Sequence, residues 1–194
     1  MRISRASPRS SAAPAAFTLV ELLVAVGLSG FVLAGVLATT VELTRSGLRV
    51  TNYAEMDSQV RRALALLEVD LKAASNFKLN AASDITVTVP KSDGTTAQYT
   101  YAWSNLTYSF FRVPGASSAI FSGRVELIKG VPLLAGGSPG VAFSRLDRLG
   151  NAATTDGATK SVQVALTVSR DVGLAAKTTS TVTATFTLRN KRTS

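Results

Sequence analysis

The residues that could do chemistry are few and scattered along this chain. Its 194 residues include no cysteine and no histidine, which excludes thiol catalysis, disulfides and histidine-based proton transfer or metal binding. Ser75 and Lys78 have the S-x-x-K spacing of some acyl-transfer enzymes, but no companion motif of those enzymes occurs. Asp147, Asn151 and Asp156 could offer oxygen atoms to calcium, although their sparse spacing favours solvated turn residues. The sequence therefore indicates no enzyme, no metal site and no cofactor.

One carboxylate lies in an unusual place. Glu21 is the only charged residue in the apolar segment from Phe17 to Val41. A carboxylate is unfavourable inside a membrane-spanning segment, and less so near its end. Two explanations are open: the side chain reaches the lipid headgroups from a position near the interface, or it has a partner.

The segment that carries Glu21 is long enough to cross a membrane. Residues 1–16 are basic, with three arginines and no acid, and the apolar residues follow directly. At about 1.5 Å per residue, the uncharged part of the segment spans roughly 30 Å, the thickness of a hydrocarbon core. This order is typical of a secretory signal or a signal anchor, and the apolar part is too long for an ordinary signal-peptide core. We expect residues 1–16 on the cytoplasmic side and the bulk of the chain across the membrane.

The helical pattern continues beyond the apolar segment. Apolar residues recur every three or four positions over 53–74, which predicts an amphipathic helix with one face toward a core. Residues 42–76 are therefore read as a continuation of the membrane helix, and Gly47 and Asn52 allow a bend near 44–52. The members of the predicted core-facing stripe are Tyr53, Met56, Val60, Ala63, Leu67, Leu71 and Ala74.

Residues 77–194 are predicted to form a β-rich globular domain. β-Branched residues and period-two alternation replace the helical pattern after Asn76, and Gly-rich segments separate the runs. The fold class is thus α+β, a long N-terminal helix packed on an antiparallel sheet. The predicted strands are 84–89, 97–103, 106–112, 120–121, 124–128, 141–146, 162–168 and 178–188, the last two paired with each other; residues 150–160 are predicted to be a mobile loop.

A hairpin around Ser104-Asn105 gathers most of the aromatic residues of this domain. A two-residue turn there would place Trp103, Tyr101 and Tyr99 opposite Leu106, Tyr108 and Phe110, all on one face of the sheet. The favoured interpretation is a core face under the amphipathic helix. The alternative is a stacking platform for single-stranded nucleic acid, which the net charge of +7 over residues 77–194 would support.

The start of the apolar segment resembles a known family. The string Ala16-Phe17-Thr18-Leu19-Val20-Glu21-Leu22-Leu23, preceded by a basic leader, is similar to the processing site of type IV pilins and type II secretion pseudopilins. The family has glycine where this chain has Ala16. The order of the later segments, including Ala63–Leu71, is similar to J-type minor pseudopilins and PilW-like minor pilins.

The resemblance implies a structural role. A prepilin peptidase/methyltransferase would cut between Ala16 and Phe17 and methylate the new Phe17 amine, and Glu21 would be the assembly residue. The partners would be that enzyme, inner-membrane lipid and other pilins or pseudopilins, with the 77–194 domain in the periplasm and the subunit near a filament tip. Two other readings stay open: a tip-located binding module for DNA uptake or adhesion, and an unprocessed single-pass membrane protein. Nucleic acid is the weaker candidate partner.

Overall fold

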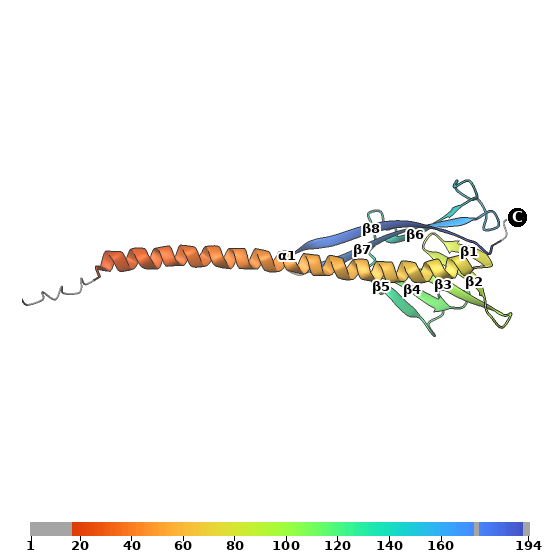
Figure 1. Ribbon diagram of the computed structural model, residues 1–194, viewed down its shortest axis with the longest axis horizontal. Helices are drawn as coiled ribbons and strands as arrows, with labels where there is room; N and C mark the ends of the chain where they lie inside the picture. The colour runs from red at the N-terminus through yellow and green to blue at the C-terminus, as the bar shows by residue number, and fades with distance from the viewer. Residues whose placement is uncertain (1–16, 173–174, 192–194) are drawn as a thin grey trace, which may run out of the picture. The chain divides into compact units, whose positions relative to one another are not determined.

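The computed structural model describes residues 17–172 and 175–191 of the chain (Figure 1). One long α-helix, α1 (Leu19–Ala73), precedes eight β-strands, β1 to β8. Residues 44–52, where the sequence allows a bend, are helical throughout. The chain divides into two compact units, one ending at Thr44 and the other beginning at Arg45. The architecture is α+β with a long apolar helix, as predicted.

The strands form two antiparallel sheets in place of the single sheet expected. The first has the order β1-β2-β3-β4-β5 and consists of β1 (Asn76–Ala81), β2 (Asp84–Pro90), β3 (Thr96–Ser104), β4 (Ser109–Pro114) and β5 (Val125–Lys129). The second has the order β6-β7-β8 and consists of β6 (Val141–Leu146), β7 (Ser161–Val172) and β8 (Ala175–Thr187). Backbone hydrogen bonds connect the two sheets, from Ser169 N–H to the Gly130 carbonyl (2.7 Å) and from Phe143 N–H to the Ala82 carbonyl (2.7 Å).

The predicted pairing of β7 with β8 is confirmed. The predicted register of the aromatic hairpin is wrong. Trp103 pairs with Phe110 and Ser104 with Ser109, so residues 105–108 form a four-residue turn in place of the predicted two-residue turn. Tyr108, placed in a strand by the sequence, adopts a left-handed φ of 48° within that turn. A shift by an even number of positions keeps each side chain on its face of the sheet. The predicted face therefore survives for the residues that remain in strands.

Two further strand predictions differ from the structure. Residues 120–121 are not a strand; they belong to the segment 115–124 that connects β4 to β5. The strand β1 was not predicted, since its sequence Asn-Phe-Lys-Leu-Asn-Ala lacks β-branched residues. Pairing with β2, with Phe77 opposite Val87, holds it in the sheet.

The second half of α1 packs one stripe of side chains into the core of the unit that begins at Arg45, called the globular unit below. Leu67 and Leu71 are fully buried there, among the inward residues of both sheets. Burying such a leucine contributes about 1.5–3 kcal/mol, so the stripe is what holds this part of the helix to the sheets. The buried members are those predicted, except that Tyr53 is half-exposed and donates its hydroxyl to the Thr179 carbonyl at 3.2 Å.

Candidate functional site

Glu21 lies in the first turn of α1 and closes a capping box with Thr18. The Thr18 amide and hydroxyl donate to Glu21 Oε2 at 2.9 and 3.0 Å, and the Glu21 amide donates to the Thr18 hydroxyl at 3.2 Å. These bonds satisfy backbone donors that the start of a helix leaves without intrahelical partners. Sequence reasoning considered the headgroups or an unspecified partner for Glu21 and missed this local one. The signal was present as the pattern Thr-x-x-Glu before an apolar run.

The capping box leaves one carboxylate oxygen available. Both bonds to Thr18 use Oε2, and no described residue bonds Oε1. Phe17, the residue predicted to become the N-terminus, is 80% exposed. Ala16, on the other side of the predicted cleavage point, lies outside the described residues. The predicted roles of Ala16, Phe17 and Glu21 in processing and assembly stay predictions.

The apolar helix following the cap exposes all its large hydrophobic side chains. From Phe17 to Val41 every residue is exposed, and the most apolar window of α1 has a mean hydropathy of 2.3 with none of it buried. By length and composition this helix could cross a membrane. Monomeric soluble proteins rarely leave so much contiguous apolar surface uncovered.

The hydroxyl groups in this helix are satisfied within the helix itself. Ser29, Thr39, Thr40 and Thr44 each donate to the carbonyl four residues earlier, at 2.7 to 2.8 Å. An unsatisfied hydroxyl would be unfavourable in hydrocarbon, where water cannot reach it. The segment therefore presents no unsatisfied side-chain hydroxyl at these four positions.

The aromatic hairpin contributes two fully buried rings to the core. Tyr101 and Phe110 are fully buried with ring centroids 6.0 Å apart, and Trp103 donates its indole N–H to the Val131 carbonyl at 2.9 Å. Leu106 and Tyr108, expected on the same face, lie exposed in the turn. The rings of Tyr101 and Phe110 are thus unavailable to stack on a base.

A buried ionic cluster joins α1 to this face of the first sheet. Tyr101 donates its hydroxyl to Asp70 Oδ2 at 2.6 Å, and Arg112 Nε and Nη2 donate to the same oxygen at 2.9 and 2.8 Å. The Arg112 guanidinium also lies over the Tyr99 ring, 3.5 Å from its centroid. Burial, reinforced by the bond to Asp70, raises the pKa of Tyr101 above its ordinary value. The cluster has a structural role, because it connects α1 to β3 and β4.

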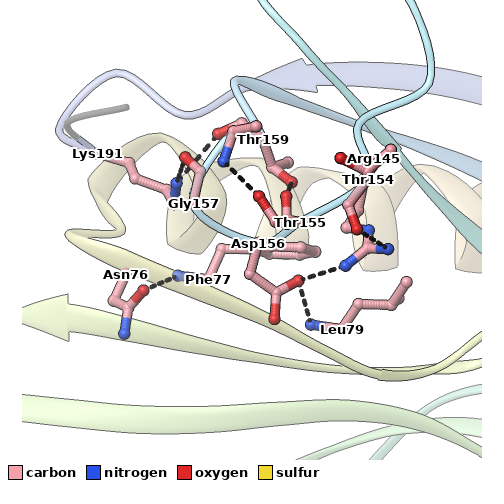
Figure 2. Close-up of polar contacts among 11 residues, drawn as sticks. Asn76, Phe77, Leu79, Arg145, Thr154, Thr155, Asp156, Gly157, Thr159 and Lys191 are labelled. Atoms are coloured by element: carbon pink, nitrogen blue, oxygen red, sulfur yellow. Dashed lines mark hydrogen bonds and ion pairs between the residues drawn. The ribbon is translucent and has the colours of Figure 1, made fainter. Parts of the chain in front are cut away.

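The acidic residues considered for calcium, Asp147 and Asp156, accept bonds from other groups of the protein. Asp147 Oδ1 accepts the backbone amides of Leu149 and Asn151 at 2.8 and 2.9 Å, which is a turn motif. Asp156 Oδ1 accepts Arg145 Nη1 at 3.0 Å and the Leu79 amide at 3.2 Å (Figure 2). Within the described residues, no group of three or more acidic side chains could hold a metal ion.

In the same region, hydrogen bonds connect the loop before β7 to Lys191. Figure 2 shows the Lys191 amine reaching the carbonyls of Gly157 and Thr159, at 2.8 and 3.2 Å. Burial lowers the pKa of the Lys191 amine; the attraction of Asp156 opposes this effect and the nearby Lys160 adds to it. Residues 150–160, predicted as a mobile loop, are therefore bonded at several points to the elements around them.

No protein-family model matches the chain, and no curated protein matches it either. The candidate functional site is therefore defined by the chain's own residues: the Thr18–Glu21 cap, Phe17 beside it, and the exposed apolar helix that follows.

Proposed function

We propose that this chain is a structural subunit of the type IV pilin and type II secretion pseudopilin class. It is inserted in the inner membrane by α1, processed before Phe17 by a prepilin peptidase/methyltransferase, and assembled through its N-terminal helix with other pilins or pseudopilins, near a filament tip. The observation that carries the proposal is an exposed, membrane-length apolar helix whose single carboxylate lies in its first turn. A β-rich globular unit on the periplasmic side completes the arrangement.

The two oxygens of Glu21 suggest how the helix would be placed in an assembly. Oε2 holds the cap on Thr18, while Oε1 has no partner among the described residues. Cleavage before Phe17 would create an ammonium group close to the start of the helix. In a filament, Oε1 of one subunit would accept the Phe17 ammonium of a neighbour. An unpaired charge in an apolar assembly is unfavourable, so this pairing would fix the relative register of the helices.

Two substitutions separate the capping role of Glu21 from its charge. Glu21→Gln keeps an amide oxygen that can accept the Thr18 bonds, because glutamine also closes a capping box, but it removes the charge. Thr18→Ala removes the capping hydroxyl and keeps the carboxylate. We expect both variants to enter the membrane, and only Glu21→Gln to lose recovery in the filament fraction sheared from cells. Glu21→Gln recovered like the wild type would contradict the assembly role, as would a loss for Thr18→Ala as large as that for Glu21→Gln.

The capping box also favours a second candidate. Because Thr18 bonds Oε2 of Glu21 at the start of the same helix, the carboxylate has a local role in an unprocessed single-pass membrane anchor as well, without any neighbour. In that case the leader stays attached, and the subunit stays in the membrane fraction after shearing. The mass of the native N-terminus separates this candidate from the first.

The charge of the globular unit favours a third candidate, a tip-located module that binds DNA. Residues 77–194 carry 13 basic and 6 acidic side chains. The burial of Tyr101 and Phe110 leaves phosphate attraction as its main source of affinity. A salt titration of DNA binding tests this candidate. Binding no tighter than that of an unrelated protein of equal charge would remove it.

A further inference from the structure

The second sheet ends in a long strand with an unpaired edge. β8 (Ala175–Thr187) is the last strand in the order β6-β7-β8, and its only strand partner in the described structure is β7 (Figure 1). Such an edge presents a row of backbone N–H and C=O groups to another extended chain.

The register shows which backbone groups of β8 face outward. Along β7, the amides of Thr167 and Ser169 donate to carbonyls of Gly140 and Gly130, on the side away from β8. Alternate residues of a strand point to opposite neighbours, so the even-numbered residues of β7 bond β8. Their partners in β8 are also even-numbered, as in Leu166 opposite Val182. The odd-numbered residues of β8 therefore direct N–H and C=O outward.

Four of these outward residues have no described partner for their backbone groups. The hydroxyl of Tyr53 already occupies the carbonyl of Thr179 at 3.2 Å. The next odd positions are all exposed, and no bond to their N–H or C=O groups occurs among the described residues: Thr181, Thr183, Thr185 and Thr187.

The other edges are protected by features that β8 lacks. β1 is short and irregular, and the Asp156 carboxylate accepts the Leu79 amide on it. β5 has five residues, two of them charged, and an irregular register against β4. In β6, the Phe143 amide bonds the Ala82 carbonyl. By contrast, residues 178–188 contain no charge, no proline and no glycine, and their pairing with β7 is regular. Short length, charge and irregularity are the usual means of preventing strand addition.

Charge at the two ends of the edge indicates the kind of strand that fits. Lys177 and Arg189, both exposed, bracket the uncharged residues, and neither makes an ion pair among the described residues. Asp171 lines the same hollow as Lys177 without forming an ion pair with it. Like charges opposite each other in a sheet are destabilising, and opposite charges are favourable. The edge therefore suits a strand with an acid toward each end.

The same charges disfavour a second copy of this chain. An antiparallel β8–β8 pair centred on Thr183 would place Lys177 opposite Arg189 at both ends. A parallel pair in register would place each cation opposite its own copy. Either arrangement juxtaposes like charges, so a different protein is the better occupant.

We propose that the outer edge of β8, from Thr181 to Thr187, is a strand-addition site for an extended, proline-free segment of a partner protein with an acidic residue toward each end. From Lys177 to the end of β8 at Thr187 the strand spans about 33 Å at about 3.3 Å per residue, and Arg189 lies two residues after that end, so the segment extends over most of the strand. This inference does not depend on processing at Phe17 or on filament assembly.

The probe is a synthetic peptide of alternating threonine and valine with glutamate at both ends, matched in length to the Lys177–Arg189 span. The full chain is kept in detergent micelles, and amide hydrogen exchange is followed with and without saturating peptide. We expect exchange at Thr181, Thr183 and Thr185 to slow by at least about tenfold, while even-numbered amides, already bonded to β7, change little. This alternation would not arise from non-specific association.

Two backbone variants provide matched controls. Thr183→Pro removes an outward N–H that the fold does not use, and edge strands tolerate proline at such positions. Ala184→Pro removes an N–H bonded to β7 and is expected to disrupt the sheet. Thr183→Pro should leave the circular dichroism spectrum unchanged and abolish the protection by the peptide.

Several outcomes would overturn the proposal. They are the absence of added protection, protection that is equal at odd and even residues, or peptide binding that Thr183→Pro does not reduce. A peptide with lysine at both ends that binds as tightly would refute the charge argument. A dimer of the full chain that Thr183→Pro dissociates would show that the occupant is a second copy, and would also refute it.

Discussion

The contribution of the Tyr101 hydroxyl to the free energy of unfolding can be worked out from the structure. Tyr101→Phe removes the 2.6 Å bond to Asp70 and leaves the carboxylate paired with Arg112. A hydrogen bond to a charged group contributes about 1.5–3 kcal/mol. Tyr101 is fully buried, so water does not replace the lost donor. We expect Tyr101→Phe to lower the free energy of unfolding of the globular unit by about 2 kcal/mol.

Removing the other partner should be more damaging. Asp70→Ala leaves the Arg112 guanidinium, whose side chain is 20% exposed, without its carboxylate, and leaves the Tyr101 hydroxyl without its acceptor. Breaking a buried ion pair from one side costs about 3–5 kcal/mol, and the partial exposure of Arg112 places the expected loss near the lower end, at about 3 kcal/mol. For a unit of this size, 1 kcal/mol corresponds to a shift in Tm of about 2–4 °C.

The assay follows Trp103, the only tryptophan in the chain, through urea unfolding of the full chain in micelles. Its indole is bonded within the globular unit, so its fluorescence reports that unit alone. The double variant Tyr101→Phe with Asp70→Ala completes a cycle that measures the coupling. Tyr101→Phe within about 0.5 kcal/mol of the wild type would show that the Tyr101–Asp70 bond does not stabilise the unit, and Asp70→Ala less destabilised than Tyr101→Phe would show the same of the Asp70–Arg112 pair.

Three further predictions follow from the globular unit. Because folding raises the pKa of Tyr101, the free energy of unfolding has its full value below the ordinary tyrosine pKa near 10 and should fall above that pH by up to about 1.4 kcal/mol per pH unit. Tyr101→Phe should flatten this alkaline decline in unfolding measurements. Gly130→Ala should destabilise the unit more than Gly136→Ala, because both glycines have positive φ but only at Gly130 would a Cβ meet a backbone oxygen, at 2.4 Å; equal midpoints in urea would contradict this. Leu67→Ala should lower the free energy of unfolding by about 2–5 kcal/mol, while Val69→Ala, at a 63% exposed position on the same helix, should change it little; similar losses would show that the buried stripe of α1 is misplaced.

The sequence predicts the periodic elements well because their patterns are strong. The helix from the apolar segment through Leu71, and strands such as β2, β6 and β8, follow from periodicity and β-branched composition. β1 lacks these signals, since Asn76, Lys78 and Asn80 are poor strand formers. Its place in the sheet comes from pairing with β2, a tertiary effect that local composition does not encode.

The hairpin register illustrates a second limit. Tyr108 adopts a positive φ, a conformation that sequence rules assign to glycine or asparagine, so the four-residue turn had no visible signal. The division into two sheets was also missed, because alternation within a strand does not specify its neighbours. The even register shift explains why the core face was nevertheless predicted correctly for Tyr101 and Phe110.

The candidate site was only partly predictable. Glu21 was identified as unusual from its apolar surroundings, and its bond to Thr18 could have been predicted from the capping-box pattern. The open edge of β8 could not have been predicted from the sequence, because recognising it requires the strand order and the residues that protect the other edges.

The mass of the N-terminus of the protein isolated from its native membranes shows whether the chain is processed before Phe17, on which the proposed function depends. A chain that begins at a methylated Phe17 is the predicted result, since processing would generate the ammonium that pairs with Glu21. A chain that still begins with the basic leader of residues 1–16 would contradict the proposed function.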